Sequence, residues 1–179
     1  MKNILFALAL LVSVQASAQT KSAILTASGL TCSMCSKSIY KALVKIPYVQ
    51  SVEADVEKSS FSITFKEGSK VSFDDVKKAV QDAGFSVASL QAIISFNGQD
   101  IANDAHINIG GNTLHFIHVE HQKLTGDKTV TIIDKNFLSS KEYKKYGKYT
   151  TMKCFATGVK EDCCPKDKTT PNRVYHVTI

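Results

Sequence analysis

Residues 29–43 read GLTCSMCSKSIYKAL, and this stretch decides how the first half of the chain folds. Before Gly29, apolar and polar residues alternate from Ala23 onwards, which is the pattern of a strand. After the cysteines, apolar residues recur at helical spacing until Pro47, which stops the helix. The two cysteines are therefore expected in the turn that leads from a strand into a helix.

The residues that follow complete a recognisable order of elements. Residues 52–56 and 61–65 alternate apolar and polar side chains, as expected of the two strands of a hairpin. Ser72 and Asp75 begin a second helix with a capping-box-like pair, and Gly84 ends it before a last strand. The order βαββαβ predicts an α+β, ferredoxin-like domain with both helices on one face of an antiparallel sheet.

This order places Cys32 in the loop after the first strand and Cys35 in the first turn of the first helix. A helix N-terminus favours thiolate over thiol, and two thiolates across such a bend suit a two-coordinate soft ion, of which Cu(I) is the leading choice. Zinc needs four ligands, or three and a water, and residues 21–92 contain no histidine. Met34 is expected to be an exposed loop residue rather than a third ligand.

The motif, together with the segments VEADVEKSSFSITFKEG and DVKKAVQDAGFSV, resembles the heavy-metal-associated (HMA) domain family over about residues 21–92. This is the family of copper chaperones, copper-pump N-terminal modules and periplasmic mercury-binding proteins. The resemblance implies that Cys32 and Cys35 are the metal ligands and that Phe85 packs under their loop. Leu30 stands where the family usually has methionine, and it is expected to pack beneath the loop in the same way. The implied metal is Cu(I), alternatively Hg(II) or another soft metal.

Residues 1–18 have the pattern of a cleavable secretory signal, with a positive start, the apolar run ILFALALLVSV and an Ala-x-Ala exit. The run is shorter than the roughly 20 apolar residues that span a bilayer. We expect cleavage after Ala18, a periplasmic or secreted protein, and no membrane span in the mature chain. The formal charge of +6 comes mostly from scattered lysines, so nucleic-acid binding is not expected.

Residues 93–179 differ in sequence pattern from the HMA-like domain at 19–92. The runs NTLHFIHVEH, KTVTIID, TTMKCFATGV and RVYHVTI favour strands, whereas SSKEYKKYGKY favours a helix that begins at Ser139 or Ser140. Several short strands around one helix predict a small β-rich domain, with an OB-like barrel as the expected architecture.

The cysteines of this second part allow two interpretations, because five cysteines in an exported protein is an odd number. Met152 and Cys154 are predicted to share one face of a strand, and Cys163 and Cys164 lie in a charged loop. The favoured interpretation is a disulfide from Cys154 to Cys163 or Cys164. The alternative is a second metal site formed by Met152, Cys154, Cys163 and Cys164.

The run HFIHVEH spaces three histidines at three-residue steps. On the predicted strand, His115 and His121 share a face and His118 lies opposite, so a single three-histidine site is not expected. Surface or partner-facing roles are the favoured interpretation, and a metal role is the alternative. The other two histidines, His106 and His176, are assigned no role.

The pattern as a whole favours an exported Cu(I)-binding protein that passes its ion by ligand exchange and is not an enzyme. Expected partners are metal-donor or metal-acceptor envelope proteins such as a copper transporter, and the protein is expected as a monomer or a metal-bridged dimer. Lys37 and Lys41 could steer an acidic partner, although a solvated helix face is the simpler interpretation. Three alternatives stay open: a periplasmic Hg(II)-binding protein, a thiol–disulfide oxidoreductase using Cys32 and Cys35, and a metal-sensing adaptor.

Overall fold

The computed structural model describes residues 18–30, 33–162, 164 and 172–179. Its elements, in chain order, are β1 (Gln19–Ser28), α1 (Ser33–Leu43), β2 (Val49–Asp55), β3 (Ser60–Phe65), α2 (Phe73–Asp82), β4 (Ser86–Ile101), β5 (His106–Ile109), β6 (Asn112–Phe116), β7 (Gln122–Ile132), α3 (Ser140–Tyr146), α4 (Cys154–Thr157) and β8 (Val174–Thr178). Among the described helices, none is long and apolar enough to cross a bilayer.

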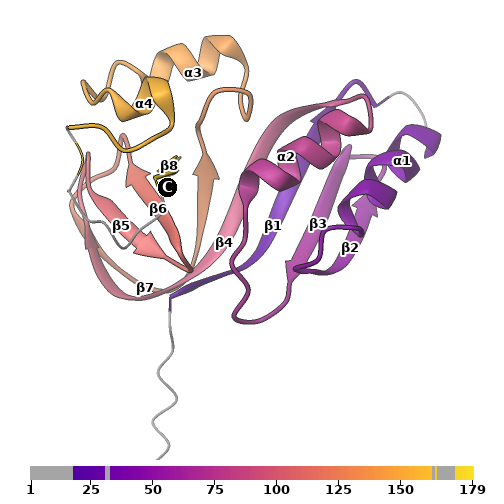
Figure 1. The fold of residues 1–179 in the computed structure, drawn as a ribbon, viewed down its shortest axis with the longest axis horizontal. Coiled ribbons are helices and arrows are strands. Elements are labelled where there is room, and N and C mark those ends of the chain that lie inside the picture. Colours follow the sequence, from indigo (N-terminus) through magenta and orange to yellow (C-terminus); the bar gives the residue numbers. More distant parts are fainter. Residues whose placement is uncertain (1–17, 31–32, 163, 165–171) are drawn as a thin grey trace, which may run out of the picture.

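The first six elements form the predicted ferredoxin-like arrangement. The strands lie in the order β2-β3-β1-β4, with every neighbouring pair antiparallel. Helices α1 and α2 lie side by side over one face of these strands (Figure 1). Each helix buries an apolar stripe against the sheet, with Ile39 and Leu43 from α1 and Val76 and Val80 from α2. The βαββαβ prediction is therefore confirmed.

Helix α2 begins and ends where its local sequence requires. The hydroxyl of Ser72 accepts a hydrogen bond from the backbone N–H of Asp75 at 3.2 Å. After the helix, Gly84 has φ +89°, a conformation that glycine adopts without steric cost. The turn at Gly84 directs the chain into β4, with Phe85 immediately before the strand.

The second half of the chain continues the same sheet rather than forming a separate barrel. One eight-stranded sheet has the order β2-β3-β1-β4-β7-β8-β6-β5, so β2 and β5 are its edges among the described residues. The strand β4 is 16 residues long and pairs with β1 at one end and with β7 at the other (Figure 1). The predicted boundary between residues 92 and 93 falls inside β4, and the OB-like barrel is not confirmed.

The alternating side chains of β4 explain why the strand does not stop at the predicted boundary. Leu90, Ala92, Ile94 and Phe96 are all buried on one face. The same period of two therefore runs through both halves, and one apolar core includes residues from each of them.

Local predictions in the second half have mixed outcomes. Helix α3 begins at Ser140, and Ser139 and Glu142 form its capping box, so this prediction is confirmed. The strand predicted around Cys154 is wrong, because Cys154–Thr157 forms the short helix α4, which ends at Gly158 with φ +71°. Met152 and Cys154 therefore do not share the face of a strand.

Arg173, the residue before β8, forms ion pairs with both halves of the chain. Its Nε lies 2.7 Å from Asp74 Oδ2 in α2, and a terminal nitrogen lies 2.8 Å from Asp134 Oδ2 after β7. Beside this network, the edge of the Tyr175 ring packs on Phe73, with ring centroids 5.0 Å apart. The HMA-like part and the second part thus share a strand, a core and a network of ion pairs.

Candidate metal centres

The metal loop, residues 29–35, follows β1 and includes the first three residues of α1. Gly29 has φ +82°, and a Cβ atom built on it would lie 4.0 Å from the Phe85 ring. Leu30 and Phe85 are partly buried and both pack against the core. Phe85 therefore lies beside Gly29 at the start of the metal loop, whereas the packing of Leu30 and Phe85 under the whole loop stays a prediction.

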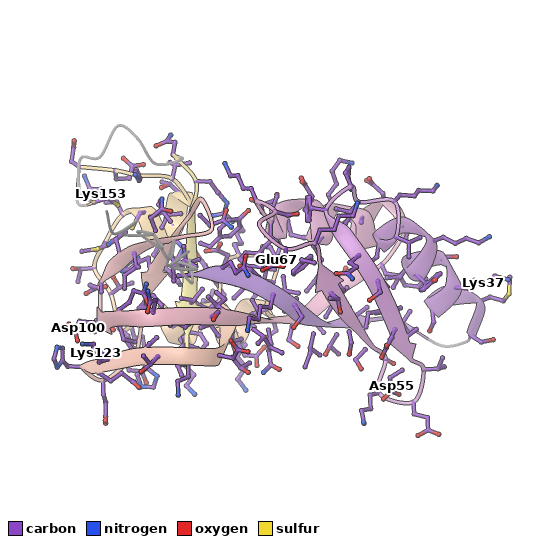
Figure 2. The ribbon with its side chains drawn as sticks, turned by 90° about the horizontal axis from the view of Figure 1, so that it is seen from below. Lys37, Asp55, Glu67, Asp100, Lys123 and Lys153 are labelled. Atoms are coloured by element: carbon purple, nitrogen blue, oxygen red, sulfur yellow. The ribbon has the colours of Figure 1, made fainter. Side chains whose placement is uncertain are left out.

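Cys35 lies in the first turn of α1, with its side chain partly exposed. That turn contains no acidic residue, so the partial positive charge of the helix N-terminus faces the thiol without a competing carboxylate. Met34 beside it is 67% exposed, as predicted. Cys32, the other predicted ligand, lies outside the described residues. Lys37, two residues further along α1, projects at this end of the molecule (Figure 2).

A second group of metal-ligating side chains lies at the other end of the sheet. His106 in β5 and His115 in β6 are direct cross-strand partners, and their rings stack with centroids 4.1 Å apart. The Cys154 Sγ lies 3.5 Å from His115 Nδ1 and 3.8 Å from His106 Nε2. We call His106, His115 and Cys154 the buried cluster, because their ligand atoms all lie within 4.8 Å of one another and two of the three side chains are fully buried.

Asp104 orients both histidines of the buried cluster. Its carboxylate Oδ1 lies 3.0 Å from His115 Nε2, and its carbonyl oxygen lies 3.2 Å from His106 Nδ1. Both oxygens are acceptors, so those two ring nitrogens carry the hydrogens. The nitrogens that face Cys154 are therefore lone-pair donors, which is the tautomer that a metal requires.

The surroundings of the buried cluster also favour the neutral form of its two imidazoles. Burial, followed by repulsion from His106 and His176, lowers the pKa of His115 to about 4, although Asp104 opposes the shift. Burial likewise lowers the pKa of His106. Near neutral pH these rings are uncharged and can act as ligands.

A third histidine, His176, adjoins the cluster from β8. It is the cross-strand partner of His115 in the parallel β6–β8 pair, and the two ring centroids are 5.0 Å apart. Its Nδ1 hydrogen-bonds to Asp134, which Arg173 holds from the other side. Its Nε2 is buried and has no hydrogen-bond partner among the described residues.

The sequence patterns predict only part of this arrangement. The surface interpretation of His115 is wrong, because its side chain is fully buried. His118 and His121 are exposed outside the strands, so the three histidines of HFIHVEH do not form one site. His106 and His176 were assigned no role, although both lie at the cluster. A usable signal was the pair Gly110-Gly111, which is placed symmetrically between His106 and His115 and makes a two-residue hairpin turn.

The four residues predicted as an alternative second metal site do not all lie at the buried cluster. Of its four residues, Cys154 belongs to the buried cluster, Met152 is partly buried and Cys164 is buried. Cys163 lies outside the described residues. The disulfide from Cys154 to Cys163 or Cys164 therefore stays a prediction.

Comparison with known proteins places the first half of the chain in a family. Residues 24–86 match the heavy-metal-associated domain. The periplasmic component of the mercuric transport protein of Pseudomonas fluorescens is 36% identical over 86 residues, which are 48% of this chain and 93% of that protein. The copper chaperone CopZ of Staphylococcus haemolyticus is 30% identical over 64 residues, 36% of this chain and 93% of that protein.

A third relative is much longer than the matched segment. A probable copper-exporting P-type ATPase of Archaeoglobus fulgidus is 32% identical over 68 residues, and the match covers 38% of this chain but only 8% of the ATPase. The fold and these matches define a heavy-metal-associated module. The chain belongs to the heavy-metal-associated domain family through this first half.

Proposed function

We propose that this protein is an exported carrier that binds Cu(I) through the thiolates of Cys32 and Cys35 and passes it to partner proteins. The observation that carries the proposal is the place of Cys35, which is partly exposed in the first turn of α1 and lies within a segment that belongs to the heavy-metal-associated family. Soft thiolates select Cu(I), and the N-terminus of a helix favours the thiolate form.

The exposure of Met34 and the partial exposure of Cys35 support transfer by ligand exchange. Met34 is 67% exposed beside Cys35, so a partner's thiolate has a path to the bound ion. The incoming thiolate would make the ion three-coordinate before one of the original sulfurs leaves. No group in this exchange is oxidised or reduced, and the protein acts as a carrier rather than an enzyme.

The proposed location and partners follow from the N-terminal segment. A secretory signal in residues 1–18 would place the mature chain in the periplasm or outside the cell, where its donor or acceptor would be an envelope protein such as a copper transporter. Expression in a Gram-negative host, followed by fractionation and mass measurement of the exported form, tests this part. Export with cleavage after Ala18 is expected, and retention of the intact chain in the cytoplasm would contradict it.

The metal proposal is tested by an anaerobic Cu(I) titration of the reduced mature protein against a chromophoric Cu(I) chelator. The wild type should hold one more tightly bound copper than the Cys32→Ser/Cys35→Ser variant. Met34→Leu is the matched control, since it changes the exposed residue between the ligands and should leave the stoichiometry unchanged. Equal copper binding by the wild type and the double variant would overturn the proposal.

Mercury is the second candidate, because one relative at 36% identity is the periplasmic component of a mercuric transport protein. The same two thiolates would hold Hg(II) in a two-coordinate geometry. Competition between Hg(II) and Cu(I) for the wild-type protein in the presence of glutathione ranks the two ions. Displacement of Cu(I) by stoichiometric Hg(II) under these conditions would make mercury the better assignment.

A further inference from the structure

We propose that the buried cluster of His106, His115 and Cys154 is a second metal site, which takes a closed-shell transition-metal ion, Zn(II) or Cu(I), independently of the metal loop. The site is assembled from β5, β6 and the start of α4, all of which lie outside residues 24–86 that match the heavy-metal-associated domain. It differs from the metal loop in chemistry as well as in place, with one thiolate and two imidazoles instead of two thiolates.

The distances within the cluster agree with metal coordination. An ion bonded at roughly 2.0 Å to an imidazole nitrogen and roughly 2.3 Å to sulfur holds these two atoms about 3.5–3.8 Å apart at trigonal or tetrahedral angles. The observed separations from Cys154 Sγ are 3.5 Å to His115 Nδ1 and 3.8 Å to His106 Nε2. Both separations from sulfur therefore suit a shared ion, and all three ligand atoms lie within 4.8 Å of one another.

The hydrogen bonds around the buried cluster favour a bound cation between its three ligand atoms. Asp104 accepts from one nitrogen of each histidine, so the nitrogens of His106 and His115 that face Cys154 are both acceptors. A thiol carries one hydrogen and can donate to one of them. A thiolate with a bound ion satisfies both nitrogens at once, and Asp104 then acts as the outer-shell partner that fixes ligand orientation in metal sites.

His176 adjoins the cluster and has a buried ring nitrogen without a hydrogen-bond partner among the described residues. Its Nδ1 is committed to Asp134, which leaves Nε2 as a lone-pair donor that is buried and without a hydrogen-bond partner. Buried polar atoms of this kind are rare in native structures, and a bound ion is one of their ordinary explanations. In the parallel pair of β6 and β8, His176 lies next to His115, with the two ring centroids 5.0 Å apart.

The ligand set defines which ions are expected. Imidazole and a single thiolate suit Zn(II) and copper, whereas hard ions such as Mg(II) and Ca(II) prefer oxygen ligands. Three ligands alone favour Cu(I), and addition of His176 or a water would complete the tetrahedral set of Zn(II). Both ions share the same donor chemistry, so the experiment has one arm for each.

The test uses the reduced, anaerobic Cys32→Ser/Cys35→Ser protein as parent, so failure of the metal loop cannot imitate failure of this site. Zn(II) is titrated against a chromophoric zinc chelator, and Cu(I) separately against a chromophoric copper chelator. One equivalent of at least one ion is expected in the parent. Addition of Co(II) should give a thiolate-to-metal charge-transfer band, which reports the sulfur ligand directly.

Variants of the parent assign the ligands. Cys154→Ser should abolish the charge-transfer band, and His106→Gln should weaken binding by more than Asp104→Asn, for which a loss of about 10-fold to 100-fold is expected. His106 is the partly exposed member of the cluster, so His106→Gln is the variant most compatible with folding. His121→Gln, at an exposed histidine outside the strands, is the matched control and should bind as the parent does.

Two results would overturn the proposal. One is the absence of tight Zn(II) and Cu(I) binding in a folded parent, or binding that Cys154→Ser and His106→Gln leave unchanged. The other is a stable disulfide from Cys154 to Cys163 or Cys164 as the only form of the exported protein, found by peptide mapping without reduction. Circular dichroism of each variant shows whether a loss of binding reflects unfolding instead, and zinc-dependent thermal stabilisation of the parent but not of Cys154→Ser provides a second readout.

Discussion

The Cys35 side chain is partly exposed in the first turn of α1, next to a methionine that is 67% exposed, whereas the Cys154 side chain is fully buried beneath α4. The first thiol lies in a partly exposed helix turn that a partner can approach, and the second lies against His106 and His115. Exposure allows an incoming ligand to attack the bound ion before the old ligands leave. Burial requires the protein to open first, so the two sites are suited to exchange and retention, respectively.

The largest expected difference between the two sites is the rate at which each loses Cu(I) to a chelator. We compare Cys154→Ser, which keeps the metal loop, with Cys32→Ser/Cys35→Ser, which keeps the buried cluster, after each has been loaded with Cu(I). If opening of the second half costs about 3 kcal/mol, transfer to excess chelator should be on the order of 100-fold slower from the cluster. Stopped-flow absorbance measures both rates, and equal rates would contradict the distinction between exchange and retention.

The connection between the halves provides the next test. Arg173 bridges Asp74 and the buried Asp134, so Arg173→Ala leaves a buried carboxylate without its cation and should lower the free energy of unfolding by about 3 kcal/mol. Lys21→Ala is the matched control, because Lys21 and Asp127 also join β1 to β7 but both side chains are about half exposed. That change should cost less than about 1 kcal/mol. Urea unfolding measures both values.

The shape of the same unfolding curves sharpens the comparison between the halves. A shared strand and a shared core predict one cooperative transition for the wild type. If Arg173 is the main link, the Arg173→Ala curve should separate into two steps, with the tyrosine signal near α3 lost first. A single transition in the variant would show that β4 and the common core are sufficient to couple the halves.

Acid should weaken the ion pair of Asp74 with Arg173, and the loss in free energy of unfolding should be smaller than that caused by Arg173→Ala. Burial raises the pKa of Asp74, but hydrogen bonds from Arg173 and Lys77 outweigh it and hold the pKa at about 2. The unfolded chain takes up this proton first, at its ordinary pKa of about 3.9. Stability from Asp74 is therefore present above about pH 4 and is lost as the pH falls towards 2.

About 1 kcal/mol of stability is expected from this source, because the Asp74 carboxylate is about a third exposed and is screened by solvent. The measurement is the free energy of unfolding in urea at pH 5 and pH 2.5 for the wild type and Asp74→Asn. The variant should be less stable at pH 5 and should lose about 1 kcal/mol less on acidification. Equal losses in the two proteins would show that the ion pair adds nothing.

The two halves also differ in how much of them the sequence could predict. In the first half each element carries its own boundary signal, such as the cap at Ser72 and the positive φ of Gly84. The cysteine motif is local as well, because both predicted ligands lie within four consecutive residues. Local signals of this kind suffice for a fold whose strands and helices alternate in a regular order.

The second half depends on contacts that no local pattern contains. Strand β8 inserts between β7 and β6, and its parallel pairing brings His176 next to His115 from 61 residues further along the chain. Helix α4 begins at Cys154 without a side-chain cap, so its start gives no sequence signal. The hairpin that joins His106 to His115 was predictable from the two glycines of its turn, but the approach of Cys154 to both rings was not.

The smallest expected effect concerns partner approach to the metal loop. Lys37 and Lys41 are exposed on α1, and neutralisation of both to glutamine should slow Cu(I) transfer to an acidic partner about 3-fold at low salt, with the difference lost at high salt. Lys123→Gln/Lys128→Gln removes the same charge from exposed positions on β7, and Figure 2 shows Lys123 at the opposite end of the molecule from Lys37. This control should transfer at the wild-type rate. A similar slowing in both variants would mean that net charge alone governs the encounter, whereas slowing confined to the α1 variant would locate the docking surface beside the metal loop.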